Sequence, residues 1–420
     1  MLDCVIVGAG AAGLAAARQL TKHGKRCLVL EARDRIGGRI HSDYSLADFP
    51  IELGAEFIHG EGASTHALLA EAGLATIPVD RYGKLRWGSA HSLLETLPTE
   101  LSATLEGLKN SYQQLGTTAL SEDLSLATYL EAKGWTKADL EIADVLLAQT
   151  CCASIYGLSA ADLQREMKND TAGGLEFRIR EGYGALLRHL GKNLTIQLNK
   201  AVVEIQQMEQ GIKLRCQDSS YEAKTCIVTL PLSLLQREII SFRPELSQTK
   251  RKAIRALKME AGTKLIYGFQ QSFWDDDLTY LLHTGVLARW WTPEYGRGKS
   301  RVISAFVTAD RATKIDKMSE LAALELGLYE LSKLLDLSIK QLRDNLSFAK
   351  RICWMNDPWS RGAYAHVPVG VAEARVDLAK PEGRIFFAGE ACAYFSNPQT
   401  VHGAFDSGIL ASEQCLNSLD

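Results

Sequence analysis

The stretch Val5-Ile6-Val7-Gly8-Ala9-Gly10-Ala11-Ala12-Gly13-Leu14 decides the fold. Before it, Met1 to Val7 reads as a short buried strand that is apolar after Asp3, and after it Leu14 to His23 has helical character. Glycines at this spacing permit a tight turn, a close backbone approach to a pyrophosphate and close helix–strand packing, while the helix N-terminus faces the phosphates. The sequence therefore predicts a strand–turn–helix unit of the kind that binds dinucleotides.

A second strand and a second glycine turn extend this unit. Lys25 to Leu30 is predicted as a strand, and Glu31 at its end would accept hydrogen bonds from a ribose hydroxyl and repel a 2′-phosphate. In "RDRIGGRI" (Arg33–Ile40), two more glycines and Arg39 indicate another backbone approach to the same phosphates. A glycine turn that binds nothing and a solvated Arg39 are the alternatives.

Composition restricts the class of protein. The chain has 420 residues, 46% hydrophobic and 23% charged, which predicts a soluble protein of two domains. A net charge of -3 without basic blocks argues against nucleic acid as a partner. Nine cysteines without a CxxC pair predict buried thiols in a reducing compartment, and no His or Cys pair has metal-ligand spacing. We therefore expect a cytoplasmic protein without signal peptide, membrane span or metal.

Seven further motifs follow one another along the chain. They are "IELGAEFIHG" (Ile51–Gly60), "EGYGALLRHL" (Glu181–Leu190), "KAVVEI" (Lys200–Ile205), "TCIVTLPLSLL" (Thr225–Leu235), "GTKLIYGFQQSFW" (Gly262–Trp274), "WSRGAY" (Trp359–Tyr364) and "RIFFAGEACAYFSNPQTVHGAFDSG" (Arg384–Gly408). In this order, and together with the first forty residues, they resemble the flavin-containing amine oxidases, nearest the polyamine oxidase branch.

The resemblance implies an α/β fold with a discontinuous, Rossmann-like FAD-binding domain and a mixed α+β substrate domain. This is the two-domain architecture shared by amine oxidases and p-hydroxybenzoate hydroxylase. The FAD-binding domain would comprise residues 1–70, 192–245 and 376–420, and the substrate-binding domain 71–191 and 246–375. Inside the latter, helical spacing covers Leu101–Gln114 and Ala127–Ala153, and Ser121 could be a helix N-cap.

FAD is the cofactor that the resemblance implies. It would be noncovalent, because Ala363 stands where the monoamine oxidases carry the cysteine that bonds to the flavin. The residues expected at the cofactor are Gly8, Gly10, Ala12, Gly13, Glu31, Ala32, Arg33, Gly38, Arg39, Gly54, Ala55, Glu56, Val202, Gly389, Glu390, Thr400 and Val401.

Five residues are expected at the reaction site by the same resemblance. Lys264 would hold a water against flavin N5, Tyr364 and Trp359 would form aromatic walls, and Thr400 would leave room for a long amine. His59 could hydrogen-bond or deprotonate an ammonium substrate at neutral pH. The alternatives are structural: a histidine satisfied in the core, a lysine whose amine reaches solvent, and aromatic core packing.

The implied function is that of a polyamine oxidase. It would oxidise a C–N bond to an imine that hydrolyses to aldehyde and amine, with O2 reduced to H2O2. An L-amino-acid oxidase is one alternative, with Arg178, Arg289 or Arg361 facing the substrate carboxylate; a non-catalytic flavin-fold binding protein is the other. We expect a small amine and O2 as partners, no nucleic acid or membrane, and a monomer or homodimer.

Overall fold

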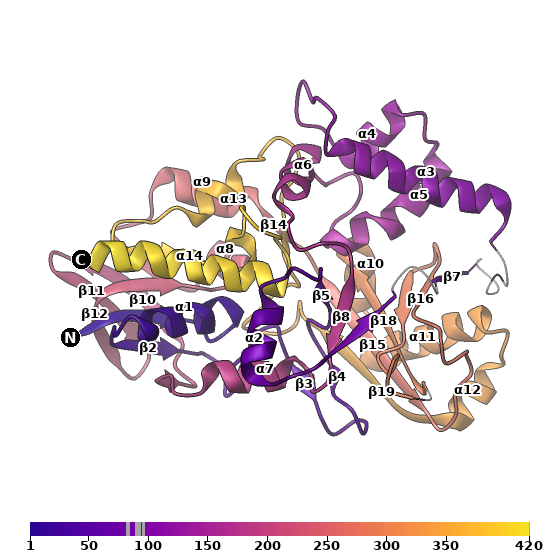
Figure 1. Cartoon of the computed structure of the whole chain (residues 1–420), viewed down its shortest axis with the longest axis horizontal. Coiled ribbons are helices and arrows are strands. Elements are labelled where there is room, and N and C mark those ends of the chain that lie inside the picture. Colours follow the sequence, from indigo (N-terminus) through magenta and orange to yellow (C-terminus); the bar gives the residue numbers. More distant parts are fainter. Residues whose placement is uncertain (81–84, 89–93, 95–96, 299, 420) are drawn as a thin grey trace.

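The computed structural model describes residues 1–80, 85–88, 94, 97–298 and 300–419. Two sheets dominate the fold: an eight-stranded sheet near both chain ends and a six-stranded sheet at the opposite end of the molecule (Figure 1). A group of helices packs on the second sheet, above it in this view. The overall class is α/β, as the sequence predicts.

The eight-stranded sheet draws its strands from three parts of the chain, residues 2–30, 196–243 and 385–387. Its strands are β1 (Leu2–Val7), β2 (Cys27–Leu30), β9 (Ile196–Gln197), β10 (Val202–Met208), β11 (Gly211–Cys216), β12 (Ser220–Val228), β13 (Ser241–Arg243) and β21 (Ile385–Phe387). β1 is central and runs parallel to β2 and β12, and β21 runs parallel to β12. The division into two domains at the boundaries given above stays a prediction.

Both faces of β1 are buried, as expected of a parallel strand. Ile6 packs with the helices on one face, and Val5 packs with β10, β11 and the small helices on the other. The helices around this sheet are α1 (Ala11–Lys22), α7 (Tyr183–Gly191), α8 (Leu232–Gln236), α9 (Gln248–Ala256), α13 (Ala374–Ala379) and α14 (Val401–Leu419). α1 and α14 lie side by side, so the two ends of the chain form one layer (Figure 1).

The six-stranded sheet is mostly antiparallel. In spatial order its strands are β19 (Leu346–Cys353), β15 (Gly262–Phe269), β18 (Val302–Thr308), β17 (Arg289–Trp291), β16 (Tyr280–Leu282) and β7 (Leu85–Trp87). Leu265 and Tyr267 of β15 pack against α10 (Ala309–Asp316), α11 (Glu320–Leu334) and α12 (Ile339–Asn345). Because side chains alternate along a strand, Lys264 and Ile266 face the other way, and Ile266 packs with Ile51 and Leu53.

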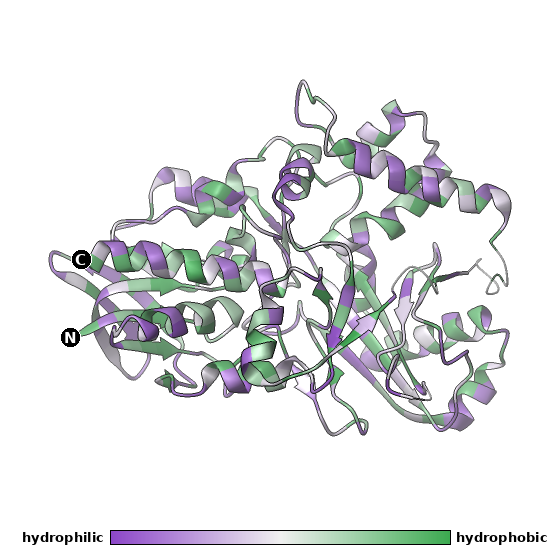
Figure 2. Cartoon of the chain, in the orientation of Figure 1, coloured by the Kyte–Doolittle hydropathy of each residue, from purple (hydrophilic) through white to green (hydrophobic). Residues whose placement is uncertain are grey.

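The helical group consists of α3 (Thr99–Leu115), α4 (Leu126–Ala132), α5 (Lys137–Leu146), the 3-10 turn η1 (Ala148–Cys151) and α6 (Ala160–Asn169). The single helical segment predicted for Ala127–Ala153 is divided, because Gly134 takes a φ of 93° and Thr136 starts α5 with a capping box. The prediction of Ser121 as an N-cap is wrong; Ser125 caps α4 by accepting the Thr128 N–H. Apolar and polar colours alternate along α3 and α14 (Figure 2).

Short elements join the two large sheets. β5 (Ile58–His59), β8 (Glu176–Ile179) and β6 (Thr76–Val79) form a three-stranded sheet next to α2 (Thr65–Ala72). β3 (Ser42–Asp43) pairs with β4 (Ile51–Glu52), and β14 (Lys258–Met259) pairs with β20 (Ala365–His366). The 3-10 turn η2 (Glu390–Cys392) follows β21. These elements bring the motifs at residues 51–60, 262–274 and 359–364 together.

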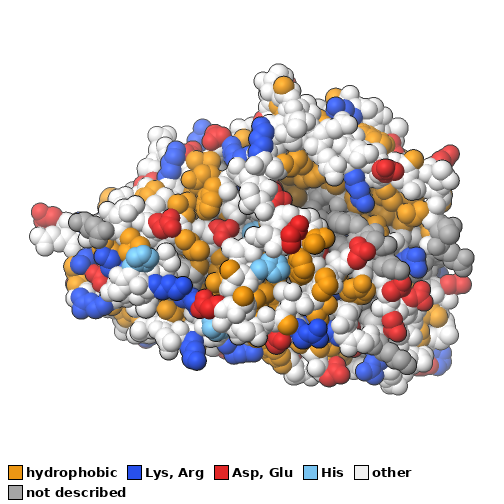
Figure 3. All heavy atoms as spheres, in the orientation of Figure 1, with side chains coloured by type: hydrophobic (Ala, Val, Ile, Leu, Met, Phe, Trp, Pro, Cys, Tyr) orange, Lys and Arg blue, Asp and Glu red, His pale blue; other side chains and the backbone are white. Residues whose placement is uncertain are grey.

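The surface charges, the cysteines and the helix hydropathy can be compared with what the composition predicts. Basic and acidic side chains are interspersed with apolar ones over the face shown in Figure 3. All nine cysteines are free thiols. Among the described residues, no helix has both the length and the apolar character needed to cross a bilayer.

Candidate active site

The glycine turn between β1 and α1 has the backbone geometry that the motif predicts. Gly8 has a φ of 105°, which favours glycine, and a Cβ on Gly13 would lie 1.9 Å from the Gly8 carbonyl oxygen. A Cβ on Gly10, in contrast, would meet no atom within 4 Å. Gly8 and Gly13 are therefore required by the turn itself, and Gly10 faces open space at the N-terminus of α1, where a pyrophosphate fits.

Glu31 closes this turn from the end of β2. Its buried carboxylate accepts the Ala9 N–H at 2.7 Å and the Arg33 N–H at 2.9 Å. These bonds hold the carboxylate against the first glycine turn. Its contact with a ribose stays a prediction, as does the role of Ala32 beside it.

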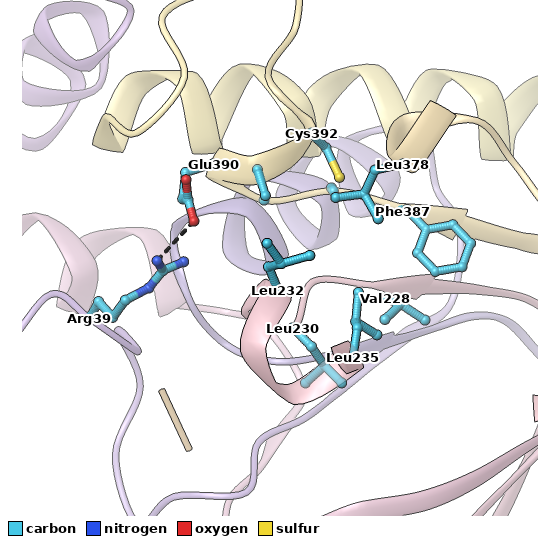
Figure 4. A pocket seen from close by; sticks show the side chains of 12 residues that line it. Arg39, Val228, Leu230, Leu232, Leu235, Leu378, Phe387, Glu390 and Cys392 are labelled. Carbon is cyan, nitrogen blue, oxygen red and sulfur yellow. Dashed lines mark hydrogen bonds and ion pairs between the residues drawn. The ribbon is translucent and has the colours of Figure 1, made fainter. Parts of the chain in front are cut away.

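The second glycine turn leads to Glu390, far away in sequence. Gly38 has a φ of 58°, and a Cβ there would lie 3.6 Å from the Gly10 Cα, so the two glycine turns touch. The next residue, Arg39, donates from Nη1 to Glu390 Oε1 at 2.9 Å and to the Ala363 carbonyl at 2.5 Å. Figure 4 shows this pair at the polar end of a small apolar pocket whose wall includes Leu232. The structure thus brings three of the predicted cofactor segments to one place.

Arg33 has a different partner. Its guanidinium binds both carboxylate oxygens of Asp357, at 2.7 and 2.6 Å, and also donates to the Ser360 hydroxyl. Asp357 in turn accepts the backbone N–H of Trp359 at 3.0 Å, which ties the backbone of this half-buried residue to the same cluster. Trp359 therefore lies next to the cofactor segment around Arg33, and its role as an aromatic wall stays a prediction.

The stretch Gly54–Glu56 approaches Arg39 and then turns inward. A Cβ on Gly54 would lie 1.8 Å from the Arg39 carbonyl oxygen, and the Ala55 N–H donates to the same oxygen at 3.3 Å. Gly54 is therefore necessary because the two backbones touch. Glu56 then points away from this contact, into the space beneath β15.

Lys264 and Glu56 form a buried ion pair. Lys264 Nζ lies 2.9 Å from Glu56 Oε2 and donates to the Glu52 carbonyl at 2.9 Å, and both side chains are at least nine-tenths buried. The same carboxylate accepts Nε of Arg178 at 2.9 Å and the indole N–H of Trp291 at 3.0 Å. Burial acts to raise the pKa of Glu56, but the charges of Lys264 and Arg178 outweigh it and hold this pKa below its ordinary value.

Aromatic rings surround this pair. The Trp291 ring lies 5.3 Å from Lys264 Nζ, and the Arg178 guanidinium lies 4.6 Å from the Phe57 ring centre. Trp291 stacks on Tyr280 at 5.5 Å and meets Phe57 edge-on at 5.5 Å. Lys264 therefore lies in an apolar, ring-lined environment that contains a compensating carboxylate.

His59 lies at the edge of this cluster. Its Nδ1 is 2.8 Å from Glu176 Oε2, and the two residues are direct cross-strand partners in β5 and β8. The His59 side chain is 41% exposed, so part of the imidazole is accessible. His402 is buried nearby, and burial lowers its pKa to about 4.

The remaining predicted residues are tied to backbone groups. The Thr400 hydroxyl donates to the Asn397 carbonyl and accepts the Gly403 N–H at 3.0 Å, which caps α14 ahead of Val401. The half-buried Tyr364 donates to the Thr150 carbonyl at 3.0 Å. Gly389 has a φ of 137° directly before Glu390, and Val202 begins β10. These contacts position the residues and leave their roles as predictions.

A comparison with known proteins decides the family. The sequence model described as flavin containing amine oxidoreductase matches residues 11–416. The chain belongs to this family. It is therefore an FAD-dependent oxidoreductase, as the motifs predict, and the alternative of a non-catalytic binding protein is excluded.

Relatives of this flavin amine oxidase include polyamine oxidases and demethylases. Polyamine oxidase 4 of Oryza sativa subsp. japonica is 28% identical over 98% of this chain and 88% of its own length. Lysine-specific histone demethylase 2 of Homo sapiens is 27% identical over 96% of this chain and 52% of its own length.

Among solved structures, the oxidase shares its fold with two amine oxidases. Putrescine oxidase bound to putrescine has a TM-score of 0.82 at 20% identity, and the superposition covers 99% of this chain and 99% of that one. Cyclohexylamine oxidase from Brevibacterium oxydans IH-35A has a TM-score of 0.85 at 20% identity and covers 100% of this chain and 99% of that one. At such identities the likeness concerns the fold alone.

The residues of this oxidase fit FAD. Two touching glycine turns, an open position at Gly10 and a helix N-terminus suit a pyrophosphate, and the Arg39–Glu390 pair lies beside them. The sequence analysis missed Trp291, the Glu56–Lys264 contact and the partner role of Glu176. Trp291 lies outside the family motifs, and the other two depend on which strands become neighbours in space.

Proposed function

We propose that this flavin amine oxidase oxidises a C–N bond of a polyamine to an imine, which hydrolyses to an aldehyde and an amine. O2 would be the oxidant and H2O2 the second product. The observation that carries the proposal is the cluster of Trp291, Phe57 and Tyr280, in which the Trp291 ring lies beside Lys264. Polyamine oxidases among its relatives support the substrate class.

The aromatic cluster favours a long aliphatic amine. FAD, when bound, accepts a hydride equivalent from the carbon next to nitrogen. The rings of Trp291, Phe57 and Tyr280 make this part of the protein apolar, which favours the methylene chain of such an amine. The chain of this protein thereby binds and orients the substrate rather than performing covalent chemistry.

The reacting nitrogen needs a free lone pair, so a proton must leave it. His59 is the residue that we assign to accept this proton. Because Nδ1 faces Glu176, the proton would be taken at Nε2, and the Glu176 carboxylate would stabilise the imidazolium that forms. The same carboxylate adds negative charge where a polycation would enter.

The cofactor would be held without a covalent bond. Ala363 has no nucleophilic atom, and its carbonyl already accepts Nη1 of Arg39. A methyl side chain at this position leaves the flavin ring to be held by packing and hydrogen bonds. A cytoplasmic location and a monomeric or homodimeric state stay predictions of the sequence.

One observation favours a second substrate class. Arg178 is buried and its Nη1 and Nη2 have no hydrogen-bond partner among the described residues. A guanidinium is suited to binding a carboxylate through two hydrogen bonds, so an amino acid or another amine with a carboxylate is the alternative substrate.

A substrate screen tests both readings. The FAD-loaded protein is mixed with spermidine, spermine, N-acetylated polyamines, simple monoamines and L-amino acids, and peroxide and carbonyl products are measured. We expect peroxide and an aminoaldehyde with polyamines. Turnover of amino acids alone would replace the proposal with the second class, and the aldehyde identity gives the bond that is cleaved.

A further inference from the structure

One carboxylate organises the centre of the site. Glu56 touches side chains from three different strands: Lys264 of β15, Arg178 of β8 and Trp291 of β17. It is itself placed by the contact between Gly54 and the Arg39 backbone, which belongs to the second glycine turn. Glu56 thus connects the cofactor side of the molecule to the aromatic cluster.

Charge explains why a carboxylate is needed here. Lys264 and Arg178 are two cations buried beside each other, and an ion pair with one partner removed is strongly destabilised in such a place. Glu56 is the buried anion in contact with both. Further charged groups around them are Glu52, whose side chain is bound by Ser42 and the Tyr183 N–H, and Arg297. The His59–Glu176 pair lies on the same face of β5 and β8 as Arg178.

The geometry also fixes the direction of the lysine. An ammonium has three N–H donors, and within the described residues two of them reach Glu56 Oε2 and the Glu52 carbonyl. With those two directions set, the third N–H has one remaining orientation. Trp291 is held in the same way, because its indole N–H is bound to Glu56 at 3.0 Å while its ring lies 5.3 Å from Lys264 Nζ.

We propose that Glu56 is a positioning residue of the reaction site, whose carboxylate keeps Lys264 charged and aims its third N–H while fixing the Trp291 ring beside it. In this assignment Glu56 touches neither substrate nor flavin, and this replaces the cofactor contact that the sequence analysis expects of it. Its effect passes through Lys264 and Trp291. The proposal rests on the proposed function only for the identity of the amine.

Glu56→Gln removes the charge and keeps the shape, so it is the test variant. Without the carboxylate, burial would favour the neutral amine of Lys264, which would then lose its proton at a lower pH than in the wild type. We expect the variant to bind FAD, and its rate of flavin reduction relative to wild type to fall about tenfold per pH unit above the new lysine pKa. Taking the ratio cancels the titration of the substrate.

A second readout needs no amine. The midpoint potential of bound FAD is measured against redox dyes from pH 6 to 9. At low pH the Glu56→Gln site has one more positive charge than wild type, so its potential is expected to lie above the wild-type value. The difference should shrink as pH rises and Lys264 becomes neutral. This measurement distinguishes failure of the Glu56 proposal from failure of the polyamine proposal.

Glu330→Gln is the matched control, since Glu330 is a mostly buried carboxylate that accepts the Val286 and Leu287 N–H groups instead. It should follow the wild-type potential at every pH. The proposal would be overturned if the FAD potential and the relative rate of flavin reduction of Glu56→Gln depended on pH no more than those of Glu330→Gln. If Glu56→Gln fails to fold, the triple variant Lys264→Met/Arg178→Met/Glu56→Gln decides, because it leaves neither cation buried without its carboxylate. Recovery of folded protein supports the charge compensation, and continued loss contradicts it.

Discussion

His59 and Glu176 stand opposite each other across β5 and β8, with Nδ1 and Oε2 2.8 Å apart. Both side chains are on the face of the small sheet that carries Phe57 and Arg178, because side chains alternate along a strand. The carboxylate therefore fixes the orientation of the imidazole from the protein side and leaves Nε2 for a ligand.

His59→Ala is expected to slow flavin reduction by polyamines roughly a hundredfold near neutral pH, because the proton acceptor is lost. Glu176→Gln should give a smaller loss and move the pH dependence, because an amide no longer stabilises the imidazolium. Stopped-flow reduction over a pH series measures both. Glu71→Gln, which removes an exposed carboxylate paired with Arg18, is the control. Identical pH profiles of flavin reduction for all three variants would show that His59 has only a structural role.

Lys264→Met should retain FAD but slow flavin reduction or reoxidation by roughly tenfold or more, since the ammonium next to Trp291 is lost. Lys250→Met is the matched control, because Lys250 is also buried but donates to the Leu378 and Lys380 carbonyls. Rapid-mixing absorbance separates the two half-reactions. Equal rates in both variants would rule out a role for Lys264 in turnover.

Two alanine variants of the glycine turn should behave differently. Gly13→Ala would place a methyl 1.9 Å from the Gly8 carbonyl and is expected to lower the free energy of unfolding by roughly 1–3 kcal/mol. Gly10→Ala has space for its methyl, so apoprotein stability should be unchanged while FAD affinity falls. Denaturant unfolding and flavin titration test the pair; tight FAD binding by Gly10→Ala would contradict the placement of the pyrophosphate.

Glu52 should make the stability depend on pH. Burial raises its pKa to about 7 from an ordinary 4.5, so between these values the folded state holds a proton that the unfolded state has lost. Its contribution is complete below pH 4.5 and disappears as pH rises through 7, a loss on the order of 3 kcal/mol. The free energy of unfolding of Glu52→Gln, measured from pH 4 to 8, should not show this decline. If it fell with pH in parallel with that of wild type, Glu52 would not be the cause.

Local patterns predicted much of the fold. The strand, glycine turn and helix at the N-terminus appear as β1 and α1, and the strand predicted from Lys25 to Leu30 corresponds to β2. The helical group was predicted less well. Good helix formers predicted one helical segment from residue 127 to 153, and this interpretation overlooked two local signals of a break, Gly134 and the Thr136 capping box.

The sequence by itself determined the glycine turns, the acid after the second strand, the order of the motifs and hence the family, because these depend on backbone conformation and on neighbours along the chain. Only the tertiary structure decided which side chains meet. Glu56 is separated from Lys264 by 208 residues and His59 lies in a different strand from Glu176, so no spacing in the sequence could pair them. Burial then gives these contacts their strength, because a charge removed from water must find its partner within the fold.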